Sequence, residues 1–112
     1  MFEVSFYTSI KNISPILEFL NSSNIKLRSK ILRKLKYVQE YGLTSAVPDL
    51  KKIKNTPLWE LRVLGRDNVR LLCVNCGKDK IKVLHVFVKK KQKTPLNEIQ
   101  IALKRYTEII DK

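Results

Sequence analysis

Basic side chains lie within or directly after three apolar runs that are predicted to form neighbouring strands. Arg62 and Arg70 lie within the first two runs. Lys89 and Lys90 follow the third. A guanidinium group binds two phosphate oxygens at once and stays charged, and an ammonium group stabilises negative charge that grows on a phosphorus centre. The pattern predicts a polyanion site, and we expect the polyanion to be RNA that is cleaved there.

Alternation along the predicted strands places the polar side chains on one face of a sheet. The opposite face is nearly all apolar and should meet the helices. Because the sequence offers no cluster of metal-ligating side chains, the 2′-hydroxyl of the RNA could act as the nucleophile and leave a cyclic phosphate. The side chains that share the polar face are Glu60, Arg62, Arg70, His85, Phe87 and Lys89.

Two of these residues have two interpretations each, and a third has one proposed role. His85, the single histidine, could be a general acid or base, or a half-buried strand residue bonded to a neighbour. Glu60 could be the base instead, or the ion-pair partner of Arg62 or Arg70. Phe87 could stack on an unpaired base of the RNA.

Further basic residues are predicted to contact RNA outside the catalytic group. They fall in a basic loop between two prolines, in a hairpin loop, in the cluster that follows the third strand, and on the helix predicted over residues 25–41. A solvated basic helix face is the alternative for the last of these. These residues are Lys51, Lys52, Lys54, Arg66, Lys91, Lys93, Lys30 and Lys34.

Length and composition predict one folded domain over residues 1–112. The chain is 44% hydrophobic, and its 23 basic against 10 acidic residues give a net charge of +13. Such an excess attracts polyanions and opposes the compact state. The first 20 residues lack the features of a signal peptide, and no apolar run approaches the roughly 20 residues of a spanning helix. We therefore expect a cytoplasmic protein that makes no membrane contact.

The two cysteines, Cys73 and Cys76, are predicted to be core or hairpin thiols. A redox pair would sit at a helix N-terminus, whereas these follow a strand. A zinc site would need two further ligands, and only His85 remains. We expect neither a metal nor a cofactor.

The sequence contains residues typical of helix termini in three places. Ser14-Pro15 predicts a short helix over residues 15–20, and Asn24 caps a second that stops at Gly42. Residues 43–57 are predicted to be irregular, with a basic loop over 49–55. Thr94-Pro95 opens a last helix, whose predicted apolar stripe is Leu96, Ile99, Leu103, Tyr106 and Ile110.

Strands are predicted over residues 2–7, 58–64, 69–75 and 81–88, and short turns join the last three into an antiparallel meander. The order is strand, two helices, three strands, helix. The expected fold is α+β, with a helical hairpin and a C-terminal helix packed on one face of an antiparallel sheet.

Three segments of the chain are similar to a known family. They are Leu58-Trp59-Glu60-Leu61-Arg62, Val69-Arg70-Leu71-Leu72, and the run from Phe87-Val88-Lys89 to Thr94-Pro95. Over almost its whole length the chain resembles the phage-derived, HigB-like branch of the RelE/ParE toxin superfamily. The resemblance implies a RelE-like fold and the toxin of a type II toxin–antitoxin pair. It implies ribosome-dependent cleavage of mRNA without a metal. Arg62, Arg70, Lys89 and Lys90 match the basic positions of that branch.

The resemblance also implies partners. These are the ribosome, mRNA and a cognate helix-turn-helix antitoxin similar to HigA, in a toxin–antitoxin hetero-oligomer. Two alternatives remain open from the sequence. The same superfamily contains ParE-like inhibitors of DNA gyrase that cleave no RNA, and the chain could also be a basic nucleic-acid-binding protein without catalytic activity.

Overall fold

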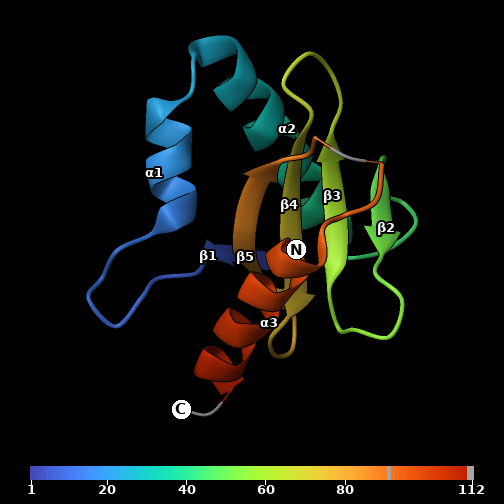
Figure 1. Ribbon diagram of the computed structural model, residues 1–112. Coiled ribbons are helices and arrows are strands. Elements are labelled where there is room, and N and C mark those ends of the chain that lie inside the picture. The colour runs from blue at the N-terminus through green and yellow to red at the C-terminus, as the bar shows by residue number, and fades with distance from the viewer. Residues whose placement is uncertain (91, 111–112) are drawn as a thin grey trace.

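A five-stranded sheet forms the centre of the protein in a computed structural model that describes residues 1–90 and 92–110. The strands lie in the order β1-β5-β4-β3-β2, and three helices pack on them (Figure 1). The α+β fold class is therefore confirmed. The strands are β1 (Glu3–Phe6), β2 (Leu50–Lys52), β3 (Trp59–Val63), β4 (Val69–Asn75) and β5 (Lys80–Val88).

The sheet differs from the predicted one at its two edges. At one edge β1 pairs with β5 in parallel, because the two helices that follow β1 carry the chain back over the sheet. At the other edge β2 is a short strand where the sequence predicted a basic loop. Its three residues pair antiparallel with β3, with Lys51 opposite Glu60. The remaining pairs, β3–β4 and β4–β5, are antiparallel as predicted.

The first two helices begin where their capping residues predict. In α1 (Pro15–Ser22) the Ser14 hydroxyl accepts a hydrogen bond from the Leu17 amide at 3.3 Å. In α2 (Ile25–Tyr41) the Asn24 side chain accepts from the Leu27 amide at 2.8 Å, and Gly42 ends the helix with a φ of 75°. That φ lies in the left-handed region that glycine adopts without strain.

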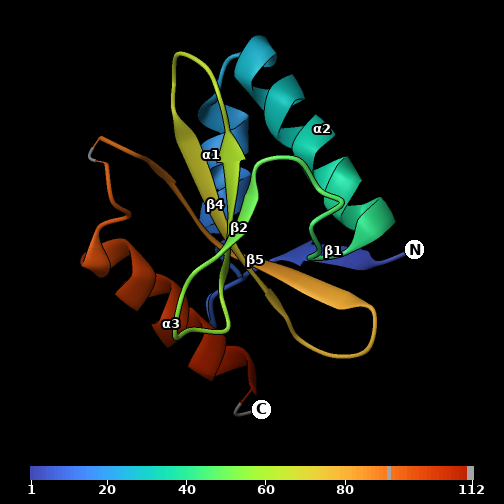
Figure 2. The same cartoon turned by 90° about the vertical axis from the view of Figure 1, so that its right-hand side faces the viewer.

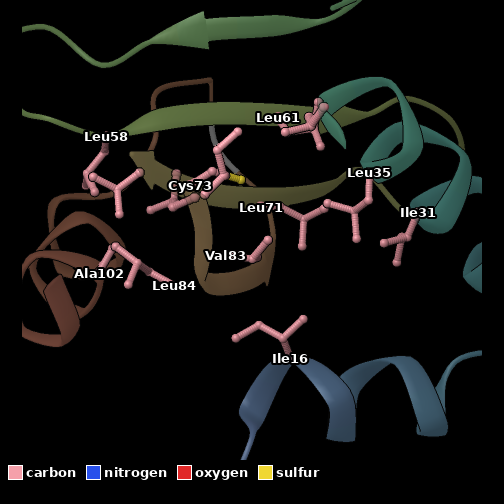
Figure 3. Close-up of a cluster of buried hydrophobic side chains, with 14 of the residues drawn as sticks. Ile16, Ile31, Leu35, Leu58, Leu61, Leu71, Cys73, Val83, Leu84 and Ala102 are labelled. Carbon is pink, nitrogen blue, oxygen red and sulfur yellow. The ribbon is translucent and has the colours of Figure 1, made fainter. Parts of the chain in front are cut away.

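The hairpin of α1 and α2 covers the apolar face of the sheet. Ile31 and Leu35 of α2 and Ile16 of α1 are buried against strand residues that include Leu71 and Val83 (Figure 3). This layer buries most of the apolar side chains that the strand alternation predicted to face the helices.

The last helix, α3 (Leu96–Ile110), lies on the other face of the sheet, so the prediction that all helices share one face is wrong (Figure 2). The half of this sheet face that α3 covers is less polar than strand alternation predicted. A β-bulge in the β4–β5 pair inserts Leu84 as an extra residue, and Leu84 is fully buried beside Ala102 of α3 (Figure 3). The small Ala102 side chain lets the helix approach the sheet closely.

The contact stripe of α3 is also shifted from the predicted one. Ile99, Leu103 and Tyr106 pack against the core as expected. Leu96 and Ile110, however, are 68% and 52% exposed. The stripe is centred on Ala102, which is fully buried, and Ile109 rather than Ile110 continues it.

Both cysteines are free thiols. Burial raises the pKa of Cys73 to about 12, which fits the predicted core thiol. Among the helices of residues 1–90 and 92–110, none combines the length and the apolar character needed to cross a membrane.

Candidate functional site

A polar hollow of about 440 Å³ lies at the end of the sheet face that α3 leaves uncovered. Residues 92–95, which lead into α3, run beside this part of the sheet (Figure 1). Arg62 and Arg70 are register partners on adjacent strands and both line the hollow. The lining residues are Arg62, Asn68, Arg70, Lys89, Lys90 and Gln92.

A second hollow of about 380 Å³ adjoins the first, because Arg62, Lys89 and Gln92 line both. The lysines of β2 and of the loop that follows it form its outer wall. We call the two hollows together the basic trough. The second hollow is lined by Lys51, Lys52, Ile53, Lys54, Glu60, Arg62, Lys89, Gln92, Lys93 and Thr94.

Glu60 holds the two arginines of the trough side by side. Its side chain is only 5% exposed, and its Oε2 atom lies 3.6 Å from Arg62 Nε and 3.3 Å from Arg70 Nε. None of these three atoms makes an aligned hydrogen bond, so the contacts are ionic. The Arg70 side chain is buried, whereas that of Arg62 is 36% exposed. The other carboxylate oxygen accepts a hydrogen bond from the Thr94 hydroxyl. One carboxylate therefore balances two cations and links them to the start of α3.

Lys89 is fixed by Asn68, which lies across the β4–β5 pair. The Lys89 amide donates to the Asn68 carbonyl at 3.0 Å, and the Asn68 side-chain amide donates to the Lys89 carbonyl at 2.7 Å. Asn68 has a φ of 52°, a conformation that asparagine tolerates better than most residues. Lys89 is 9% exposed, whereas Lys90 is exposed at the rim of the trough.

His85 lies outside the trough, beneath α3, with both ring nitrogens engaged. Its Nε2 atom is 2.7 Å from Glu98 Oε1, and its Nδ1 atom is 3.2 Å from the Arg105 guanidinium. Burial lowers the pKa of His85, although Glu98 opposes this effect. A neutral ring fits these partners, because Arg105 can only donate and Nδ1 must then accept, which leaves the proton on Nε2 facing Glu98.

The positions of the two candidate bases and of the candidate stacking residue favour structural roles. His85 has no free nitrogen, and Glu60 is buried between two guanidinium groups. Phe87 is 6% exposed and its ring stacks on His85 at a centroid distance of 5.5 Å. Their roles in acid–base chemistry and in base stacking stay predictions.

The structure brings together four of the other eight predicted RNA-binding residues. Lys51, Lys52, Lys54 and Lys93 all line the trough. Arg66 is exposed in the β3–β4 loop and lines neither hollow. Lys91 lies outside the described residues.

Lys30 and Lys34 are separated from this group. They lie on α2, on the opposite side of the sheet (Figure 2), and line a different hollow. Lys34 is also ion-paired, with its Nζ atom 2.5 Å from Asp49.

Sequence reasoning missed several polar residues that build the site. Asn68 and Thr94 were read only as parts of a turn and of a helix start, yet they hold Lys89 and Glu60 in place. Gln92 lines both hollows, and no pattern in the sequence singled it out. Arg105 sits three turns into α3 and donates to the Leu84 carbonyl at 2.9 Å, a contact that depends on which face the helix covers.

Comparison with known proteins places this arrangement in a family. A search of curated proteins finds no match to the chain. A model of one protein family, described as phage derived protein Gp49-like (DUF891), matches residues 18–107, which include the whole of the basic trough. The chain therefore belongs to the phage-derived, Gp49-like protein family, which is related to the RelE/HigB-type toxins.

Proposed function

We propose that the protein is the toxin of a type II toxin–antitoxin pair and cleaves mRNA on the ribosome, with the basic trough as its active site. The observation that carries the proposal is the pair of arginines that Glu60 holds beside Lys89 in one hollow. Membership of a family related to RelE/HigB-type toxins supports it. The single strand of mRNA would run along the trough, between the lysines of β2 and the segment after β5.

The proposed reaction is a transesterification within the RNA. The 2′-oxygen attacks the neighbouring phosphorus, a P–O bond forms, and the bond from phosphorus to the 5′-oxygen breaks. The 2′-hydroxyl loses its proton to water, and the 5′-oxygen takes one from Lys90, which then regains it from water. The products are a 2′,3′-cyclic phosphate and a 5′-hydroxyl.

The chemistry of the trough fits a charge that grows during this step. A phosphodiester carries one negative charge, and the pentacovalent intermediate carries more. Arg62, Arg70 and Lys89 are fixed before the substrate arrives, by Glu60 and Asn68. Cations that are already in place stabilise the transition state without the cost of reorganisation. In this proposal they supply the charge that a metal ion supplies in other nucleases.

The partners in the proposal follow from the family. A toxin of this kind acts on ribosomes that carry mRNA and is held inactive by a cognate antitoxin, which we propose to be a HigA-like helix-turn-helix protein in a hetero-oligomer with the toxin. The net charge of +13 fits a chain that works on nucleic acid and is stored with an acidic partner.

Analysis of the RNA ends tests the proposal. The purified protein is added to ribosomes programmed with a defined mRNA, and the fragments are probed for their termini, with Arg70→Lys as the matched variant that should cleave more slowly. We expect 2′,3′-cyclic phosphate and 5′-hydroxyl ends. Fragments with 3′-hydroxyl ends would contradict the 2′-hydroxyl attack. Intact mRNA together with trapped gyrase–DNA complexes would indicate the ParE-like alternative, and mRNA that is bound but intact the non-catalytic one.

A further inference from the structure

A second groove runs along α2 on the side of the sheet away from the basic trough. One wall is formed by Lys30, Arg33, Lys34 and Tyr37 of α2, and the other by Val63 and Leu64 at the end of β3. Its volume is about 400 Å³. We call it the α2 groove. Nothing in the proposed cleavage reaction uses it.

The apolar part of the lining of the α2 groove is partly open to solvent. Val63 is buried, but Leu64 is 54% exposed and Tyr37 is 38% exposed. A smaller hollow of about 230 Å³ continues the groove toward the C-terminus of α2, because Arg33 and Tyr37 line both. From Lys30 to Glu40 the helix rises about 15 Å, which is the length of a ten-residue helical segment.

Basic side chains flank this apolar lining, and Glu40 is the acidic residue that lines the smaller hollow. Lys34 already forms an ion pair with Asp49. Lys30 reaches the other wall, where its ammonium group lies so near Gly65 that a Cβ added there would be 2.8 Å away. Within the described residues, neither Lys30 nor Arg33 has a carboxylate within ion-pair distance. The two cations are therefore available to an acidic group that enters from outside.

We propose that the α2 groove binds an acidic, amphipathic peptide segment of a partner protein. An apolar side chain of that segment packs against Leu64 and Tyr37, and its carboxylates pair with Arg33 and Lys30. Nucleic acid fits less well, because an exposed leucine offers nothing to a phosphate backbone and Tyr37 already stacks on Tyr41 at a centroid distance of 6.5 Å. The inference goes beyond the proposed function, since it needs no cleavage. If the chain is a toxin, its antitoxin is the protein that would carry such a segment.

Fluorescence anisotropy with a synthetic probe tests this inference. The probe is a labelled twelve-residue peptide with Leu and Glu at helical spacing, and the same peptide with Lys in place of Glu is its control. Arg33→Glu and Leu64→Asp alter exposed groove residues. Lys26→Glu makes the same charge change on an exposed residue of the same helix outside the groove. Circular dichroism confirms that each variant is folded.

We expect saturable binding of the acidic probe, about tenfold weaker in Arg33→Glu and in Leu64→Asp and nearly unchanged in Lys26→Glu. A saturating single-stranded RNA should not displace the probe. Absence of saturable binding would overturn the inference, as would equal losses in Arg33→Glu and Lys26→Glu, which would indicate diffuse attraction. Displacement by RNA would show that the groove is a nucleic-acid site. Since no cleavage is measured, failure here is distinct from failure of the proposed nuclease activity.

Discussion

Glu60 is the residue on which the geometry of the basic trough depends. It is buried beside Arg70 and also contacts the half-exposed Arg62, and a buried charge that loses its partner is strongly destabilising. Removing Arg62 or Arg70 altogether would therefore affect both the fold and the site. A lysine in the same place keeps the charge beside Glu60 but loses the two-pronged guanidinium group. Variants to lysine separate catalysis from stability more cleanly than variants to alanine.

The structural role of His85 gives the first prediction. His85→Ala removes two buried hydrogen-bonding atoms and should lower the free energy of unfolding by about 1–3 kcal/mol. His85→Gln can donate to Glu98 and accept from Arg105, so it should keep most of the stability and of the mRNA cleavage. Urea unfolding and cleavage assays check this. A stable but inactive His85→Gln variant would instead support the acid–base role predicted from the sequence.

The lowered pKa of His85 sets the sign of a second prediction. The ordinary value is 6.5, and the folded protein has a lower one. As the pH falls below about 6.5, the unfolded chain takes up the proton first, so stability falls until the lower, folded-state pKa is passed. The unfolding free energy of the wild type, minus that of His85→Gln, should therefore decrease with acidification. A difference that grows as the pH falls would mean that a charged His85 is stabilised by Glu98.

Asn68 gives a third prediction because its backbone conformation and its side-chain hydrogen bond can be altered separately. Asn68→Gly keeps access to the positive φ but loses the bond from the side chain to the Lys89 carbonyl. We expect it to lower kcat while leaving KM nearly unchanged, because Lys89 is no longer held where the charge develops. A change in KM alone would show that Asn68 serves binding rather than the positioning of Lys89.

At the scale of elements, the sequence was sufficient to predict features that depend on neighbouring residues, such as helix caps. It was not sufficient to predict features that depend on strand pairing. The caps at Ser14 and Asn24 and the stop at Gly42 lie at the predicted positions, because capping depends on a few neighbouring residues. The edge strand β2 was missed, because three residues between two prolines form a strand only when β3 lies beside them.

The placement of α3 was missed for a related reason. Strand alternation marked the face of His85 as polar, but the bulge at Leu84 and the polar contacts of Glu98 and Arg105 make half of that face suitable for a helix. Arg62, Arg70 and Lys89 could be predicted from strand phase, and Lys90 from its place after the third strand. Their supports, Asn68 and Thr94, were not, because the bonds that they make join segments distant in sequence.

The docking of α3 gives a fourth prediction. Leu103 packs against the core, whereas Leu96 is 68% exposed on the same helix. Leu103→Ala should lower the free energy of unfolding by about 2 kcal/mol, near the lower end of the range for core leucines because it is only partly buried. Leu96→Ala is the matched control and should change it by less than about 0.5 kcal/mol. Equal effects in urea unfolding would show that the helix docks through a different stripe.

At the scale of the whole molecule, two separate surfaces each carry part of the charge of +13. The basic trough gathers arginines and lysines from β2, β3, β4 and the segment after β5, and the α2 groove carries a separate set on the opposite side. The sequence shows the excess of charge, but only the fold shows that Lys51 and Lys89 converge while Lys30 does not. If both proposals hold, the two ligands bind to separate surfaces and should not compete.

The central claim is that the trough, and not α2, is where the phosphodiester is broken. Single-turnover cleavage of mRNA at saturating ribosomes tests it most directly, with Arg70→Lys compared against Lys30→Gln/Lys34→Gln. We expect the first variant to cleave about 100-fold more slowly than the wild type, because it loses preorganised donors at the developing charge. The α2 variant should cleave at the wild-type rate. Equal defects in the two variants, or an unimpaired Arg70→Lys, would show that the active site lies elsewhere.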